Sequence, residues 1–313
     1  MNRLLKSLGA LLMAVILLPS CGMAQMQVVS NIEETFEGID EIVVNGGSLE
    51  VTYEGSNTAD GVFLSAYLES NRNNDTEISY KVEGNTLRVE YKRENSGGWG
   101  NSRSKGFISL TGPEDMEMEI SNSSGQMFIS NVASDKIDLR ISSGKIEARR
   151  LSSDRINLTA SSGKKEIDDI HGDVNCKISS GSGNISNVEG DVSVEGSSGS
   201  YHISEVEGTV NGSLSSGSIV LDEIGELGNL TVSSGRIEAT HAGLGDNTQL
   251  RGSSGSFTVQ TDDNLEDYNF DLSASSGGLE VGDTKTSKNL NIDNDSDMTV
   301  TGNTSSGRIS IRN

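Results

Sequence analysis

The stretch "DVSVEGSSGSYHISEVEG", Asp191–Gly208, decides the fold, because its Ser-Ser-Gly step returns along most of the chain. Successive Ser-Gly steps are separated by 19, 19, 18, 18, 18, 18, 20, 22 and 30 residues. Self-similarity at such a period is typical of stacked repeat proteins, in which each unit packs on its neighbours. The glycines of these steps are Gly125, Gly144, Gly163, Gly181, Gly199, Gly217, Gly235, Gly255, Gly277 and Gly307.

Within each unit, apolar and polar residues alternate, and a period of two predicts a strand with one buried face. The second residue after the glycine is mostly apolar, and the fourth is apolar in every unit. The alternation resumes before the next glycine, as in Val174, Cys176 and Ile178, so we expect Cys176 in the core. The fourth positions are Ile129, Ala148, Ile167, Ile185, Ile203, Leu221, Ala239, Val259, Val281 and Ile311.

The parity of the apolar positions locates the bends. Ile141 and Ile146 are both expected inside, yet a strand would place residues five apart on opposite faces, so the chain must bend at Ser-Ser-Gly. Ile185 and Val188 are three apart, which predicts a second bend, and Gly190 marks a third. The sequence therefore predicts an all-β parallel β-solenoid (β-helix) of about ten or more turns of 18–20 residues, stacked about 4.8 Å apart, with an enlarged N-terminal cap region.

The same pattern predicts how the chain is divided. A flexible loop within the N-terminal part carries the only tryptophan, Trp99, as an interaction site or, more simply, as part of a cap. The last strand, "SSGRISIRN", is expected to need protection, because an open parallel edge invites self-association, and either the lengthened turns or another copy should cap it. The predicted parts are an export signal over 1–24, a tether over 25–35, N-terminal β turns and cap over 36–106 with the loop over 95–106, and solenoid repeats over 107–313 with an irregular C-terminal cap over 278–313.

The first residues predict export. Arg3 and Lys6 precede an apolar run, Leu8–Leu18, which is too short for a spanning helix and typical of a signal peptide. "LPSC" resembles a bacterial lipobox that would make Cys21 a lipid anchor, whereas "GMA" before Gln25 would suit ordinary signal cleavage. We therefore expect a cell-envelope protein, an outer-membrane or cell-surface lipoprotein, with a periplasmic or secreted protein as the alternative.

The composition of the chain limits which partners it can bind and how its fold is stabilised. The net charge is −22, which disfavours binding to nucleic acid phosphates and to anionic membrane surfaces. Hydrophobic residues make up 33% and aromatic residues 4% of the chain, enough for a thin, elongated core. The chain has two cysteines, so Cys176 has no disulfide partner once Cys21 is acylated or removed, and the fold must be held by its ladder and packing.

Coils of the form "SSGxIxxxxVxGxVxxxxSSG" behind an export signal resemble the bacterial putative adhesin family, including its head-GIN-type members. The resemblance is clearest over 107–311 and weaker over 36–94, where "FEGIDEIVVNGGSLEVTYEG" is similar to the family's opening turns. It implies a Ser-Ser-Gly repeat β-solenoid with a surface role and brings no catalytic residues.

Candidate reactive groups are few. The three histidines, His171, His202 and His241, fall in different columns of the repeat and are not expected to converge on a metal. The acidic residues Asp168, Asp169, Glu205, Asp222 and Glu223 predict a solvated acidic face, and the calcium nonapeptide G-G-x-G-x-D is absent. Outward positions are mostly Asn, Ser, Asp, Glu and Thr, with few of the aromatic platforms that sugar-processing β-helices use. We expect no catalytic, cofactor-binding or metal residues.

These observations favour a non-catalytic envelope protein, an adhesin-like or structural module that binds a glycan or an envelope protein. Two alternatives stay open: a carbohydrate-active β-helix enzyme, either a polysaccharide lyase or a glycosidase, and a self-assembling envelope scaffold. The partners expected are an unknown glycan or envelope protein, the membrane through acylated Cys21, and a second copy through the solenoid ends.

Overall fold

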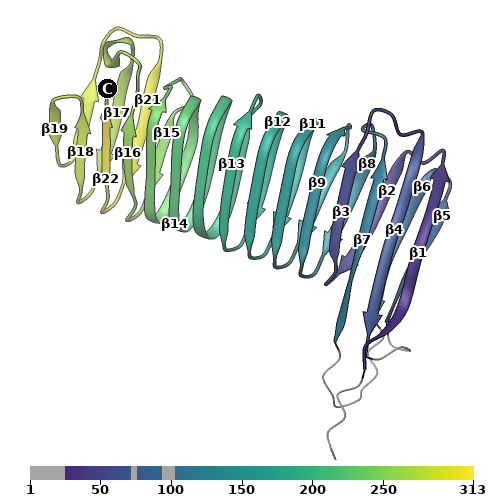
Figure 1. The fold of residues 1–313 in the computed structure, drawn as a ribbon. Helices are drawn as coiled ribbons and strands as arrows, with labels where there is room; N and C mark the ends of the chain where they lie inside the picture. The colour runs from purple at the N-terminus through teal and green to yellow at the C-terminus, as the bar shows by residue number, and fades with distance from the viewer. Residues whose placement is uncertain (1–24, 72–75, 94–102) are drawn as a thin grey trace, which may run out of the picture.

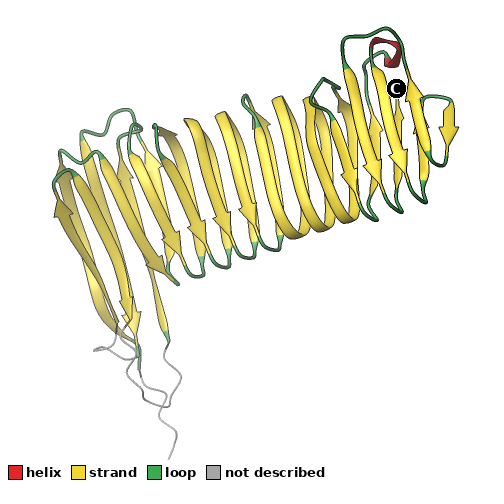
Figure 2. Cartoon of the chain, turned by 180° about the vertical axis from the view of Figure 1, so that it is seen from behind, coloured by secondary structure: helices red, strands yellow, loops and turns green. Residues whose placement is uncertain are grey.

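The structure, a computed structural model, describes residues 25–71, 76–93 and 103–313 (Figure 1). These residues form an all-β rod whose only helical element is a short 3-10 turn, Leu265–Asp267 (Figure 2). Within these ranges, no helix is long and apolar enough to cross a bilayer. The export signal with Cys21, and most of the predicted loop with Trp99, lie outside the described residues.

The strands build two long ladders that face each other across the core, and both are parallel except at their ends. The first sheet runs in the order β1 (Gln27–Glu37), β4 (Gly61–Ser70), β7 (Ser104–Gly112), β3 (Glu50–Gly55), β9 (Gln126–Ala133), β11 (Lys145–Ala160), β12 (Lys164–Ile178), β13 (Ser182–Val188), β14 (Val192–Ala242), β16 (Ser256–Gln260), β22 (Arg308–Arg312), β18 (Gly278–Val281) and β19 (Thr284–Thr286).

The second sheet lies behind it and shares the long strands that wind around the rod. Its order is β5 (Thr76–Glu83), β6 (Thr86–Arg93), β2 (Glu41–Gly47), β8 (Glu117–Asn122), β10 (Ile137–Ile141), β11, β12, β14, β15 (Gln249–Gly252), β21 (Thr299–Thr304), β17 (Asn269–Ala274) and β20 (Asn289–Ile292). Stacked parallel coils of this kind are what the glycine spacing predicted.

The Ser-Ser-Gly steps form one edge of the rod, because only glycine fits there. From Gly125 to Gly217 these glycines have φ between +103° and +152°, a region closed to other residues. A Cβ on Gly163 would lie 1.9 Å from the carbonyl oxygen of Gly144 in the preceding coil. The serines continue the ladder through their backbone, as where the Ser162 N–H donates to the Ser142 carbonyl at 2.8 Å. Ser-Ser-Gly is therefore a corner, as predicted.

The second predicted bend is also present, and it is built without glycine. The sixth residue after each of the first seven corner glycines, Gly125 to Gly235, lies in the left-handed region, with φ between +49° and +60°. Each falls between two inward positions, so the backbone turns the edge and the next apolar side chain again points inside. The residues are Asn131, Arg150, Asp169, Asn187, Glu205, Glu223 and His241.

The core is a single narrow stack of aliphatic columns, and the predicted inward positions line it. All ten fourth positions are buried, and so is Cys176. The second residues after the corner glycines stack as another column, and two of them, Lys165 and Gly183, are not large apolar residues. They lie between Ile146 and Tyr201. Lys165 is nevertheless fully buried, so position in the repeat outweighs side-chain chemistry there.

The predicted tether is wrong for most of its length. Residues 27–37 form β1, which pairs antiparallel with β4 at the N-terminal end of the first sheet. Ile32 and Phe36 are half-buried against the core, and the Phe36 ring meets Tyr80 edge-on with centroids 5.4 Å apart. These apolar contacts explain why the segment is held as a strand.

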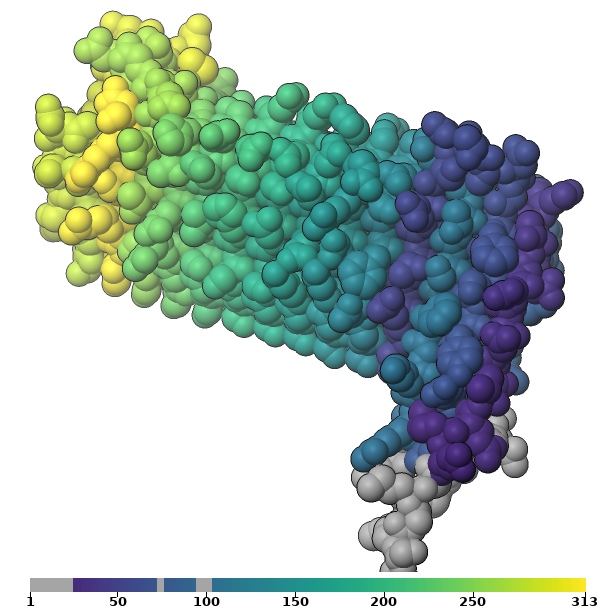
Figure 3. Space-filling view, in the orientation of Figure 1, coloured from purple at the N-terminus to yellow at the C-terminus, as the bar shows by residue number. Residues whose placement is uncertain are grey.

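The C-terminal strand is protected, as expected, but it does not lie at the end of the rod. β22 lies between β16 and β18, and β21 lies between β15 and β17, so the last coil is inserted inside the preceding one. In the space-filling view, yellow atoms of the C-terminus therefore lie among green ones (Figure 3). The corner glycines follow the same order, since a Cβ on Gly277 would meet the Gly307 oxygen at 2.0 Å. The rod instead ends in antiparallel pairs, β18–β19 and β17–β20.

Candidate functional site: a groove on the first sheet

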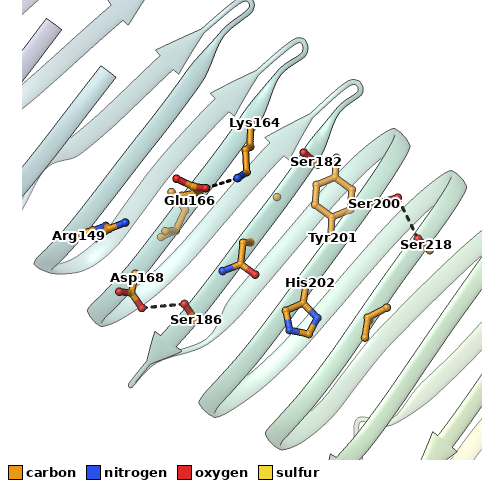
Figure 4. A pocket seen from close by; sticks show the side chains of 14 residues that line it. Arg149, Lys164, Glu166, Asp168, Ser182, Ser186, Ser200, Tyr201, His202 and Ser218 are labelled. Atoms are coloured by element: carbon orange, nitrogen blue, oxygen red, sulfur yellow. Dashed lines mark hydrogen bonds and ion pairs between the residues drawn. The ribbon is translucent and has the colours of Figure 1, made fainter. Parts of the chain in front are cut away.

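A shallow groove of about 650 Å³ is hollowed into the outer face of the first sheet, across β11, β12, β13 and β14 (Figure 4). Polar and apolar atoms contribute about equally to its surface. Its lining is Arg149, Lys164, Glu166, Ile167, Asp168, Ser182, Gly183, Asn184, Ser186, Ser200, Tyr201, His202, Ser218 and Val220.

The groove exists because one outward column changes from long to short side chains. Lys164 pairs in register with Ser182, and Ser182 with Ser200. Ser218 follows, and its hydroxyl donates to Ser200 Oγ at 3.3 Å. One coil further along, Arg236 restores a long side chain. Three successive serines therefore make a depression about 14 Å long between charged ends, at about 4.8 Å per coil.

The N-terminal wall of the groove is a network of ion pairs. Lys145 Nζ lies 2.6 Å from Glu147 Oε2 and 2.5 Å from Glu166 Oε2, and Lys164 also pairs with Glu166. Hydrogen bonds from Lys145 and Lys164 lower the pKa of Glu166 to about 2. The Glu147 and Glu166 carboxylates in turn raise the pKa of Lys145. The two lysines and the two glutamates neutralise one another, so the ion pairs hold this wall in place without giving it a large net charge.

The floor is held by hydrogen bonds between neighbouring coils. Ser186 donates to Asp168 Oδ1 at 2.9 Å, and Asn187 Nδ2 donates to the same oxygen at 2.7 Å. Asn184 lines the groove and pairs in register with His202 of the following coil, whose imidazole also lies in the groove (Figure 4). The groove thus offers hydroxyl, amide and imidazole groups along a straight path, which suits recognition of a polar chain.

A buried lysine lies directly behind this surface. Lys165 Nζ donates to the Gly163 carbonyl at 3.2 Å, and burial lowers the pKa of its ammonium. Gly183 stands next in the column, and its missing side chain leaves room for the ring of Tyr201. Among the described residues, the buried Tyr201 hydroxyl has no hydrogen-bond partner. The middle of the rod therefore has a polar interior beneath the groove.

We expect Lys165→Met to raise the free energy of unfolding at pH 7 by about 1–4 kcal/mol, because methionine fills the column without a buried charge. The folded pKa of Lys165 lies below the unfolded value of about 10.4, so the unfolded chain binds more protons between the two. Wild-type stability should rise with pH through that window, and the advantage of Lys165→Met should shrink. Urea unfolding from pH 7 to pH 10 measures this. Lys164→Met, at an exposed neighbour, is the control, and a gap that does not change with pH would contradict the prediction.

The three histidines do not converge, as predicted. His171 Nδ1 lies 2.6 Å from Glu189, His241 Nδ1 lies 3.2 Å from Asp222, and His202 lines the groove. Glu189 raises the pKa of His171, and Asp222 raises that of His241. In the part of the chain that the structure describes, no group of three or more His, Cys, Asp or Glu side chains could hold a metal ion.

The comparison with protein families matches residues 39–312 to the model described as Toastrack DUF4097. The chain belongs to this family. The match begins next to β2 and ends within β22. It therefore includes the N-terminal coils, in which β7 lies between β4 and β3, and the inserted C-terminal coil. No curated protein matches the Toastrack chain.

Solved structures similar to the Toastrack chain share little sequence with it. A "putative cell adhesion protein" of Clostridium sporogenes is 13% identical, covers 90% of this chain and 99% of its own, and has a TM-score of 0.21. A "putative lipid binding protein" of Parabacteroides distasonis is 15% identical over 93% and 98%, with a TM-score of 0.38. A "putative adhesin" of Bacteroides fragilis is 12% identical over 90% and 97%, with a TM-score of 0.34. All three TM-scores are below 0.5, so the assignment rests on the family match.

The Toastrack chain also carries aromatic side chains on the outer face of the first sheet, which the sequence analysis missed. Few aromatic residues are expected at outward positions, and this holds for the later coils but not for β4, β7 and β9. Phe63 is 42% and Phe107 is 38% exposed, and Tyr67 and Phe128 are partly exposed. A signal was available, because "VFLSAYLES" and "GFISL" are apolar at both parities, which indicates apolar residues on both faces of the strand.

Proposed function

We propose that this chain is a non-catalytic cell-envelope protein, adhesin-like in its role, that binds a glycan along the groove of the first sheet. The observation that carries the proposal is the straight run of Ser182, Ser200 and Ser218 between charged ends, flanked by Asn184 and His202. Hydroxyl, amide and imidazole groups are donors and acceptors that match the hydroxyls of sugars. The coil spacing of about 4.8 Å is close to the length of one sugar residue in an extended chain.

The state of the carboxylates supports a binding role over glycoside cleavage. A glycosidase needs one carboxyl that stays protonated near neutral pH, which requires a raised pKa. Glu166 has a lowered pKa instead, because Lys145 and Lys164 hold its charge. Asp168 is engaged by Ser186 and Asn187. Glu166 therefore lacks the environment of a general acid.

Export to the envelope belongs to the same proposal and rests on the sequence of residues 1–24. Acylation of Cys21 would place the rod at a membrane surface, with the groove free along its length. The periplasmic and secreted alternatives keep the groove but not the anchor. Self-association through the solenoid ends is a further alternative, in which the rod would act as a scaffold.

The test is a binding assay with the purified chain on a glycan array, followed by calorimetry on the glycans retained. Ser200→Arg should weaken binding at least tenfold, since it fills the groove with a side chain that the column already accepts at Lys164 and Arg236. Ser213→Arg is the matched control, because it lies exposed on the second sheet in a column that contains Lys177 and Arg251. Absence of any glycan binding, or release of shortened products, would contradict the proposal.

A further inference from the structure

The aromatic residues of the first sheet converge on one small area at the N-terminal end of the rod. In β4 and β7, Tyr67 stands directly opposite Phe107, and their rings stack with centroids 6.3 Å apart and planes inclined by 24°. Phe63 stands four residues away along β4, about 13 Å from Tyr67. Phe128 projects from β9, two strands beyond β7. We call Phe63, Tyr67, Phe107 and Phe128 the aromatic patch.

Small hydroxyl side chains form the floor between these rings. Ser65 stands opposite Ser109 in β7, and Ser109 stands opposite Thr52 in β3. Thr52 Oγ1 donates to Ser109 Oγ at 2.9 Å, and Thr52 is in turn opposite Phe128. Rings at the margins and hydroxyls at the centre therefore alternate on a flat sheet about 14 Å wide.

Contacts within the sheet hold two of the rings, those of Tyr67 and Phe128. The Tyr67 hydroxyl donates to Glu69 Oε1 at 2.5 Å, and the ammonium of Lys145 lies 5.9 Å from the centre of the Phe128 ring. Their positions on paired strands limit the motion that binding would have to freeze. A fixed aromatic surface loses little conformational entropy on binding.

From this geometry we infer that the aromatic patch is a glycan-stacking site that takes a neutral oligosaccharide. A pyranose ring has an apolar C–H face that packs on an aromatic ring, and hydroxyls at its edge that hydrogen-bond to Ser, Thr and carboxylate groups. Glu50, Glu54 and Glu69 surround the patch and can accept such bonds. The inference rests on the proposed function, because it assigns a second contact for a glycan on the face that carries the groove.

The acidic groups around the aromatic patch favour a neutral glycan over an anionic one, and they disfavour a second copy of this chain as the occupant. Two cations lie at the patch, since Lys105 stands opposite Glu69 and Lys145 lies beside Phe128. Lys145 is neutralised by Glu147 and Glu166, and Glu50, Glu54 and Glu69 leave the surroundings of the patch acidic, so an anionic glycan would be repelled. A two-fold contact between copies through this face would set the same glutamates against one another, and like charges in close contact are unfavourable. A neutral sugar avoids both of these electrostatic repulsions.

The experiment titrates the purified chain with neutral oligosaccharides of glucose, galactose, mannose and N-acetylglucosamine, and with uronic-acid oligosaccharides as the anionic arm. Phe107→Ala and Phe63→Ala should each weaken the neutral ligand at least tenfold. Tyr67→Phe should retain most of the affinity because the ring is kept. Val82→Ala, at an exposed apolar residue outside the patch, is the control and should change nothing. Thermal melting confirms that each variant is folded.

The outcomes separate this inference from the proposed function. If a glycan binds, and Ser200→Arg abolishes binding while Phe63→Ala and Phe107→Ala leave it unchanged, the proposed function stands and the aromatic patch is not a sugar site. Preference for the uronic-acid arm would overturn the neutral class. A dimer detected by light scattering that Phe107→Ala dissociates would make a second copy the occupant and overturn the inference. If no glycan binds the wild-type chain, both fail.

Discussion

Gly163→Ala should lower the free energy of unfolding by at least about 3 kcal/mol, because two costs act together. Gly163 has φ of +105°, which alanine does not adopt without strain, and the new Cβ would lie 1.9 Å from the Gly144 carbonyl oxygen. That oxygen accepts the Lys164 N–H at 2.9 Å, so moving it breaks the ladder at the corner. Thermal melting and amide hydrogen exchange measure the loss, which should be greatest in the coils on either side.

Gly84→Ala is the control for a positive φ without a steric clash. Gly84 has φ of +62°, and a Cβ there would have no heavy atom within 4 Å. Its cost should be about 1–2 kcal/mol, the value for a left-handed alanine without a clash. Equal losses for the two variants would show that the close stacking of corner glycines contributes nothing, contrary to the structure.

Ile185→Asp should cost about 4 kcal/mol or more and should open the rod locally. Ile185 is 1% exposed, and the stack offers no cation or donor in register with it, since Ile167 and Ile203 are its neighbours in the column. A carboxylate there must be buried unpaired or must take up a proton at neutral pH, and both are unfavourable. Circular dichroism melting measures the loss of stability.

The control for Ile185→Asp is Asn184→Asp, which adds the same charge one residue earlier, on the exposed face of β13. We expect it to change stability by less than about 1 kcal/mol, as surface substitutions usually do. If the two variants melted at the same temperature, the assignment of Ile185 to the interior would be wrong. Because repeats contact only their neighbours, hydrogen exchange should place the damage between β12 and β14.

Most of the fold could be predicted from the local alternation of apolar and polar residues. The corner at Gly144, the bend at Asn187 and the inward position of Ile185 all follow from parity, because a strand must place alternate residues on opposite faces. The burial of Lys165 follows from the same frame, although a lysine alone would predict exposure. The groove could also have been found from the sequence, since Lys164, Ser182, Ser200, Ser218 and Arg236 each directly follow a corner glycine.

The pairing order of the terminal coils could not be predicted in this way. The alternation of apolar and polar residues shows which face of the sheet a residue occupies, but not which coil its strand stacks on. The alternation in β22 is therefore the same as it would be if β22 lay at the end of the rod. The aromatic patch was missed for a related reason. Phe63, Phe107 and Phe128 come together only because β7 lies between β4 and β3, which is an order that the chain sequence does not follow.

The insertion of β22 between β16 and β18 constrains how the molecule can be made. The coil that contains β17 and β18 is synthesised before β21 and β22, yet those later strands are its hydrogen-bonding partners on the side that faces the rod. It cannot dock until they arrive, so coil-by-coil growth that follows synthesis must stop at β16. We expect the last step of folding to be a simultaneous closure of residues 269–312, slower than the growth of the regular coils because it joins distant segments.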